Sequence, residues 1–275
     1  MDLTRQISLR DQARAGKNYY KALRAYQQRK DILEVMYNSI DFNKIKNKQE
    51  IRLIDLGCGP GIVGLYFYKK LSKKYKSKSI EVTFLDINPL MLTAIPKQKN
   101  FHIVKGDVTK IGPTKFSSYD IVVMKQVLDY LPKNLQIKTL KNIYKILSQN
   151  GQFILSALIP PSKKAFKLTN YLYSEREKIL NPSAPIKKFI VTKDILFQWL
   201  SEIGFKNIKF NYEYEIPLSV NDFVVSFGIN KREKQDLMVL YKKIIEQDKN
   251  DIFKSKIEET DIELTEKGVV VYCCK

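Results

Sequence analysis

Histidine and cysteine are scarce in this chain, which has one His and three Cys among its 275 residues. Because His102 is the only histidine, no centre that needs two histidine ligands can form within one copy. Cys58, Cys273 and Cys274 are odd in number and lack metal-ligand spacing, so neither a zinc site nor a disulfide framework is expected. We therefore expect no metal and a reducing, cytoplasmic location.

Long apolar runs are also absent. No stretch approaches the roughly 18 consecutive apolar residues of a membrane-spanning helix, and no apolar core follows the first residues as it would in a secretory signal. The composition, 44% hydrophobic and 28% charged, is typical of a globular protein long enough to bury a large core. Disorder, collagen and fibrous coiled coil are thereby excluded as the main state.

Acidic residues are few relative to basic ones, and the formal net charge is +19. Residues 1–200 contain 36 Lys and Arg against 15 Asp and Glu, whereas residues 201–275 contain 12 against 14. Such an excess can attract a nucleic acid or another anionic partner. However, 40 of the 48 basic residues are Lys, whereas dedicated phosphate sites favour Arg. A general bias toward lysine is therefore the favoured interpretation.

Short apolar segments alternate with helical patterns along most of the chain. The apolar segments are continuous, as in strands that are buried on both faces of a parallel sheet. Asn150-Gly151 is expected to end one helix and Pro96 another. The pattern predicts an α/β fold with the sheet between helix layers. Strands are expected at 51–56, 80–85, 101–105, 119–124, 152–158, 205–216 and 268–274, and helices at 9–38, 62–72, from 88 onward, 132–148, 193–203 and 231–247.

No internal repeat or low-complexity linker divides the chain, so a single domain over residues 1–275 is expected. Pro160-Pro161 interrupts the alternation and begins a basic, Tyr-containing insertion. The terminal cap and the insertions are the parts that could close over a bound molecule. The expected parts are an N-terminal helical cap, a cofactor-binding core, a lid insertion, and a C-terminal region of helix, strands and second insertion, at 1–48, 51–158, 160–190 and 193–275 respectively.

A glycine-rich turn, residues 55–61 (DLGCGPG), joins the first expected strand to the helix after it. Glycines let a ligand approach the backbone closely, and the helix N-terminus offers free N–H groups. Gly59-x-Gly61-x-x-Gly64 matches the dinucleotide fingerprint, but that register would bury an ionised Asp55 inside a strand. A turn that begins at Gly57 instead places Asp55 at the end of the strand, facing a ligand.

In this register the turn closely resembles the first motif of class I S-adenosylmethionine-dependent methyltransferases. Four later segments resemble further motifs of that family in the same order, at residues 84–88, 106–108, 119–128 and 147–152. The resemblance covers residues 51–158. It implies a Rossmann-like, seven-stranded, mostly parallel sheet with helices on both faces, and S-adenosyl-L-methionine as the cofactor.

The resemblance also implies roles for single residues. Asp86 ends the second strand, where the family holds the ribose hydroxyls, and a carboxylate can accept two hydrogen bonds from a vicinal diol. Ile87 and Met91 would pack against the adenine ring, and Asp107 and Val108 would flank its amino group. The residues implied around the methionine part of the cofactor are Asp55, Gly57, Cys58, Gly59 and Gly61.

Lys125 and Gln126 stand at the end of the fourth strand, near the sulfonium that the resemblance implies. A cation at position 125 departs from the family, where a small or polar residue is common. We expect the Lys125 backbone, and not its ammonium, to face the cationic cofactor. No metal ligand is implied.

Asp129 and Tyr130 follow the fourth strand and are the candidate catalytic residues, since a carboxylate and a phenol there could accept a proton or orient a nucleophile. The alternative is that the pair only begins the next helix between core leucines. Cys58 as a small filler and His102 as a structural or surface histidine are favoured over a reactive thiol and a general base.

Methyl transfer to a small or medium-sized acceptor is the leading functional hypothesis. A tRNA or rRNA methyltransferase is the alternative enzyme: the positive charge favours it, but Lys125-Gln126-Val127-Leu128 replaces the Asn-Pro-Pro-Tyr-like motif of base amino-group methylation. A catalytically inactive scaffold of the same fold is the third hypothesis, which the intact acidic and glycine positions disfavour. The acceptor and the oligomeric state are left open by the sequence.

Overall fold

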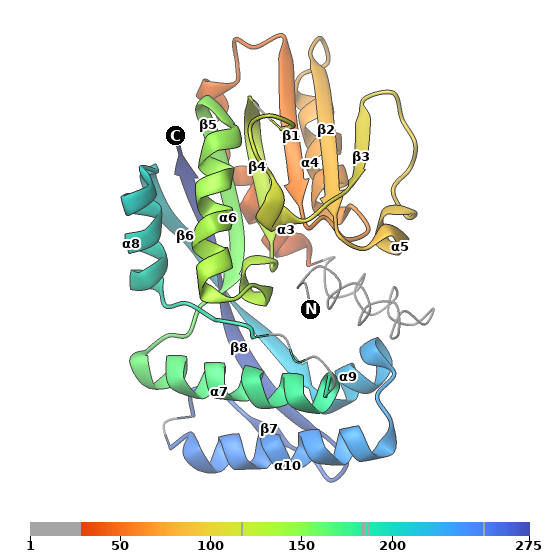
Figure 1. Ribbon diagram of the computed structural model, residues 1–275, viewed down its shortest axis with the longest axis vertical. Coiled ribbons are helices and arrows are strands. Elements are labelled where there is room, and N and C mark those ends of the chain that lie inside the picture. The colour runs from red at the N-terminus through yellow and green to blue at the C-terminus, as the bar shows by residue number, and fades with distance from the viewer. Residues whose placement is uncertain (1–28, 117, 183–184, 186, 250) are drawn as a thin grey trace.

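A single eight-stranded sheet organises the chain (Figure 1). The computed structural model describes residues 29–116, 118–182, 185, 187–249 and 251–275. Seven strands follow the order β3-β2-β1-β4-β5-β8-β6, and the short β7 pairs with β8. The first five are mutually parallel, whereas β8 is antiparallel to β5, β6 and β7. The strands are β1 Glu50–Leu56, β2 Ser79–Asp86, β3 Phe101–Lys105, β4 Tyr119–Lys125, β5 Leu147–Leu158, β6 Lys206–Ser219, β7 Lys256–Ile257 and β8 Ile262–Cys274.

Helices cover both faces of the parallel part, as the continuous apolar strands predict. Every residue of β4 is buried, because β4 lies inside the sheet with helices on either side. One face packs on α3 (Lys30–Asn38) and α4 (Ile62–Lys74), and the other on α6 (Lys133–Ile146) and α8 (Lys193–Ile203). The short elements are η1 Phe42–Lys44, α5 Pro89–Leu92, η2 Val108–Lys110 and η3 Leu128–Tyr130. The α/β, Rossmann-like architecture is confirmed.

A second, smaller core lies below the sheet in Figure 1. It is formed by α7 (Lys163–Leu180), α9 (Val220–Phe227) and α10 (Lys231–Gln247), together with the first residues of β8. The strands β6 and β8 continue from the main sheet into this lobe, where Leu218 pairs with Leu264. The lobe therefore shares strands with the core instead of being joined to it by a flexible linker.

Several expected boundaries shift in the structure. The helix predicted at 132–148 ends at Ile146, and β5 begins at the next residue. Asn150 does not cap that helix: it has φ +66° inside β5, where the pairing with β4 is irregular. The helix that follows Asn88 ends at Leu92, before Pro96. β8 begins at Ile262 and not at 268, and α9 and β7 were not anticipated.

The N-terminal cap is described only in part. The predicted helix at 9–38 is helical from Lys30 to Asn38, and residues 1–28 lie outside the described residues. Within the described ranges, no helix has both the length and the apolar character needed to cross a bilayer.

Candidate active site

The glycine turn begins at Gly57, directly after the last residue of β1, Leu56. This is the register expected from the resemblance to methyltransferases, and not the dinucleotide register. Three glycines have left-handed backbone angles, with φ +66° at Gly57, +53° at Gly59 and +81° at Gly61. These angles strain residues that carry a Cβ. Asp55 differs from its expected position facing a ligand, because it is the second-last residue of β1 and is 1% exposed. Its carboxylate accepts a hydrogen bond from the Gly64 amide at 2.8 Å, which ties the end of β1 to the first turn of α4.

The turn is also packed too tightly for side chains. A Cβ at Gly57 would lie 2.4 Å from Val127 Cγ2, and one at Gly61 would lie 2.9 Å from Ile95 Cγ1. The contact with Val127 brings the loop after β4 against the turn after β1. Glycine is therefore required there for both backbone angle and space.

Asp86 lies beside this turn at the carboxyl end of β2. Its Oδ2 accepts a hydrogen bond from the Gly59 amide and its Oδ1 one from the Asn88 amide, both at 2.8 Å. The Leu85 carbonyl accepts from the amides of both Gly57 and Cys58, at 2.7 and 3.0 Å. The glycine turn and the end of β2 thus form one hydrogen-bonded unit.

The four residues expected around the adenine ring lie in the segments that follow β2 and β3. Ile87 is half-buried beside Asp86, while Met91 and Val108 are buried. Asp107 caps η2, because its Oδ1 accepts from both the amide and the hydroxyl of Thr109 at 2.8 Å. The carboxyl ends of β1, β2 and β3 therefore bring the predicted cofactor residues to one edge of the sheet.

Lys125 extends this edge to β4, and its side chain is on the same sheet face as Asp55. Burial lowers the pKa of the Lys125 ammonium to about 8, opposed by attraction to the Asp55 carboxylate. Burial raises the pKa of Asp55 to about 7, opposed by the Gly64 hydrogen bond. The ammonium donates to Gln126 Oε1 at 3.2 Å, and Arg29 lies close enough to lower the pKa of Lys125 further.

The residue after Lys125 has an uncommon backbone conformation. Gln126 has φ +53°, a left-handed angle for a residue with a Cβ, and its amide donates to the Ser156 carbonyl at 2.7 Å. Such strain persists only where the surroundings over-determine the conformation, and it concentrates at functional sites. It turns the chain sharply at the carboxyl edge, next to the glycine turn.

Asp129 is buried in η3, the short helix after β4. Its Oδ2 accepts from the Leu158 amide at 3.0 Å, at the end of β5. Burial raises the pKa of Asp129 to about 7; the Leu158 hydrogen bond lowers it, Glu266 raises it and Lys188 lowers it. Tyr130, half-buried, has the Lys188 ammonium 4.2 Å from its ring centroid.

A buried charged cluster joins Asp129 and Tyr130 to the smaller lobe, and it was not predicted from the sequence. Lys188 forms an ion pair with Glu177 at 2.7 Å, and Arg176 forms one with Glu266 at 3.6 Å. Tyr173 Oη donates to Glu266 Oε2 at 2.6 Å. All four charged side chains are at most 7% exposed. Glu266 on β8 is about 90 residues from its partners on α7, so no local motif could have revealed the cluster.

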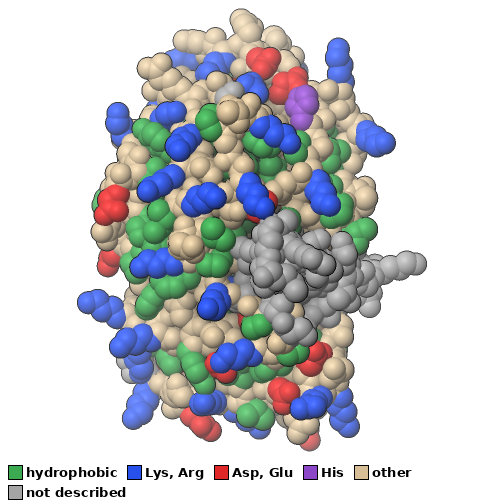
Figure 2. All heavy atoms as spheres, viewed as in Figure 1, with side chains coloured by type: hydrophobic (Ala, Val, Ile, Leu, Met, Phe, Trp, Pro, Cys, Tyr) green, Lys and Arg blue, Asp and Glu red, His purple; other side chains and the backbone are tan. Residues whose placement is uncertain are grey.

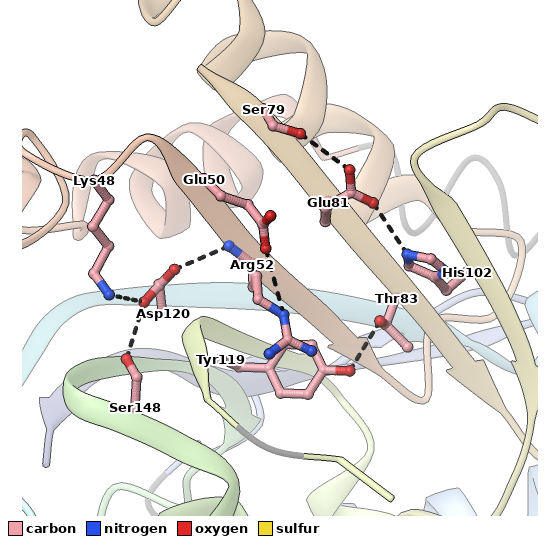
Figure 3. Close-up of polar contacts among 10 residues, drawn as sticks. All are labelled: Lys48, Glu50, Arg52, Ser79, Glu81, Thr83, His102, Tyr119, Asp120 and Ser148. Atoms are coloured by element: carbon pink, nitrogen blue, oxygen red, sulfur yellow. Dashed lines mark hydrogen bonds and ion pairs between the residues drawn. The ribbon is translucent and has the colours of Figure 1, made fainter.

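The remaining polar network lies at the opposite, amino end of the strands (Figure 3). His102 on β3 is 3.1 Å from Glu81 on β2, and the Asp120 carboxylate contacts Lys48 and Ser148. His102 is thus a surface histidine remote from the carboxyl edge. The three cysteines are buried, and burial raises the pKa of the Cys58 thiol well above its ordinary value, which fits packing and not reactivity.

Comparison with known proteins agrees with this geometry. Residues 54–153 match the family model of the methyltransferase domain. The carboxy-S-adenosyl-L-methionine synthase of Psychrobacter arcticus is 25% identical over 112 residues, which are 38% of this chain and 40% of that protein. This chain therefore matches less than half the length of that relative.

Solved structures share the fold. The YcgJ protein of Bacillus subtilis has a TM-score of 0.68 at 16% identity, over 88% of this chain and 97% of that one. A Bacillus halodurans protein described as a methyltransferase has a TM-score of 0.64 at 18% identity, over 83% and 94%. The domain match over residues 54–153, the strand order and the glycine turn thus agree with the resemblance to class I S-adenosylmethionine-dependent methyltransferases.

Proposed function

We propose that this chain transfers a methyl group from S-adenosylmethionine to a small or medium-sized acceptor. The observation that carries the proposal is the hydrogen-bonded unit of the glycine turn and Asp86 at the carboxyl edge. Its backbone cradle has no room for side chains at Gly57 and Gly61, and its carboxylate suits a vicinal diol. When bound, S-adenosylmethionine supplies an already activated methyl group.

The chain's own residues then hold the cofactor and orient the acceptor. Asp86 would bind the ribose hydroxyls, while Asp55 fixes the first turn of α4 through the Gly64 amide. Gln126 and the loop after it line the end of β4, where the resemblance puts the reacting centre. Because positioning and exclusion of water account for much of such a transfer, a strong base is not required.

We infer that Asp129 is a positioning residue. Its carboxylate is buried and accepts from the Leu158 amide, so it fixes the end of β4 against the end of β5. Tyr130, the next residue, would then present its ring toward an acceptor. The contact between Lys188 and that ring supports a site that is closed by α7 and the loop after it.

The small acceptor is supported by the relative named as a carboxy-S-adenosyl-L-methionine synthase, a name that refers to a small-molecule product. Isothermal titration calorimetry with S-adenosylmethionine, with NAD as the control ligand, tests the cofactor. Transfer of a radiolabelled methyl group to a panel of small acceptors and to tRNA and rRNA tests the acceptor. Binding of NAD without S-adenosylmethionine binding would overturn the proposal, and labelling of RNA alone would move it to the nucleic-acid alternative.

A further inference from the structure

From the end of β2 to the middle of α7, at residues 87–174, the exposed Asp, Glu, Lys and Arg side chains are all positive. Residues 87–174 contain 13 Lys, no Arg and three acidic residues. All these Lys except Lys125 are exposed, whereas the side chains of Asp107, Asp120 and Asp129 are at most 12% exposed. A lysine-rich composition alone does not explain this, because it does not remove carboxylates from the surface.

The charge is most concentrated on α6. Lys138, Lys141 and Lys145 are exposed and spaced by three and four residues, so they follow one another along one side of the helix. We call these three residues the lysine stripe; it extends about 10 Å along the helix axis. The opposite side of α6 is buried against the sheet through Leu140 and Ile143.

The lysine stripe is unfavourable for the helix by itself. Like charges at these spacings repel, and α6 has no acidic residue to offset them, even in its first turn, where the helix dipole favours one. The exposed helix α10 of the same chain differs: its basic residues are interspersed with Glu233, Asp236 and Glu246. The same lysine-rich sequence thus mixes charges on one helix and segregates them on another.

Figure 2 shows Lys and Arg side chains across the half of the molecule that carries α6, with few acidic side chains between them. η2 lies against α6, where Asn142 donates to the Thr109 carbonyl at 3.3 Å, and η2 carries the exposed Lys110. η3 directly precedes α6, so the stripe leads away from the carboxyl edge that carries the candidate site.

We propose that the lysine stripe is a docking surface for the phosphodiester backbone of a nucleic acid strand. Lysine ammonium groups contact phosphates as point charges and carry no base readout, so the contact is independent of sequence. An anionic membrane fits less well: among the described residues, no large hydrophobic side chain on α6 is exposed for insertion between lipids. The proposal stands independently of the acceptor that is methylated.

The test compares two variants that each lose three positive charges. The stripe variant is Lys138→Gln/Lys141→Gln/Lys145→Gln. The matched control is Lys231→Gln/Lys242→Gln/Lys249→Gln, which changes exposed lysines on and just after α10. Gln keeps helix propensity close to that of Lys, and none of the six residues belongs to the candidate active site. Unchanged thermal unfolding and S-adenosylmethionine binding verify that both variants are folded.

Fluorescence anisotropy with a labelled single-stranded RNA of mixed sequence gives the affinity between about 50 and 200 mM KCl. We expect the parent and the control to bind alike, and the stripe variant to bind at least about tenfold more weakly at the lower salt. The slope of log affinity against log salt should decrease by about 2 in the stripe variant, since each lost contact with a single strand contributes about 0.7.

Three results would overturn the proposal: no salt-dependent RNA binding by the parent, an equal loss in the stripe and control variants, or binding to phosphatidylserine vesicles without binding to RNA. The assay measures binding without methyl transfer. A failure of the RNA-docking proposal therefore leaves the proposed enzymatic activity unaffected, and a failure of the proposed activity leaves the docking proposal unaffected.

Discussion

The Asp86 carboxylate accepts a hydrogen bond from the Gly59 amide at 2.8 Å, and so joins the end of β2 to the glycine turn after β1. A ribose diol bound to Asp86 would therefore lie next to the turn that cradles the rest of the cofactor. One carboxylate both shapes the turn and offers itself to the ligand. Substitutions at Asp86 must separate these two roles.

Asp86→Ala is expected to weaken S-adenosylmethionine binding by about 1.5–3 kcal/mol, roughly ten- to hundredfold, through loss of charged hydrogen bonds. Asp86→Asn keeps an oxygen for the Gly59 amide but loses the charge, and should fall in between. Calorimetry measures both. Glu81→Ala, at the amino end of the same strand, is the control. An unchanged dissociation constant in Asp86→Ala would remove Asp86 from the site.

Gly57→Ala is expected to abolish detectable cofactor binding and to lower the melting temperature. The new Cβ would meet Val127 Cγ2 at 2.4 Å, at a φ that costs about 1–2 kcal/mol for a residue with a side chain. Gly112→Ala is the matched control, because nothing lies within 4 Å of a Cβ there. Differential scanning fluorimetry with and without S-adenosylmethionine separates the two variants. Normal ligand-induced stabilisation of Gly57→Ala would contradict the cradle.

Asp129→Asn is expected to lower turnover less than about tenfold and to leave cofactor affinity nearly intact, because Asn can still accept from the Leu158 amide. A general base would instead cost about 10²–10⁴-fold. The pH profile of kcat distinguishes the roles: a positioning residue leaves its shape unchanged in Asp129→Asn. Tyr130→Phe keeps the ring and tests the hydroxyl alone. A large, pH-dependent loss in Asp129→Asn would show that Asp129 is the base.

The stability of the same variant should depend on pH. The folded-state pKa of Asp129 is about 7, raised by burial above its ordinary value of 3.8. Its stabilising contribution is therefore present in acid and is lost as the pH rises through about 7, since ionisation is then easier in the unfolded chain. The difference in unfolding free energy between Asp129→Asn and the parent should therefore shift in favour of the variant by about 1–3 kcal/mol from about pH 5 to pH 8. Urea unfolding at several pH values measures this, and a pH-independent difference would contradict it.

Most helices and strands could be predicted from local sequence patterns. Helices α8 and α10 and strand β3 have the predicted boundaries. For the two helices the reason is that caps at Thr192, Gly204 and Asn230 stand beside clear apolar periods. The prediction that Asn150-Gly151 ends a helix was wrong, because an Asn with a left-handed backbone can form an irregularity in a strand as well as a helix end. α9 was not predicted, although Ser219 and Asp222 form a capping box at its start.

The candidate site divides in the same way. The Asp55, glycine and Asp86 positions follow from strand ends, which parallel pairing brings to one edge. The cluster of Lys188, Glu177, Arg176 and Glu266 could not be predicted, because only tertiary packing makes buried charges of distant segments meet. The lysine stripe could not be predicted from the net charge either, since the net charge does not say which carboxylates are buried.

The long strand β8 has a consequence for the order in which the protein can fold during synthesis. Ile262 and Leu264 complete the smaller core, while Val269, Val271 and Cys273 complete one face of the main core. β8 also separates β5 from β6, so β6 has no neighbour in the sheet before β8 arrives. β8 follows the other described strands along the chain, and neither core can close until it has emerged from the ribosome. The nascent chain must therefore keep both unfinished cores from aggregating until β8 has emerged.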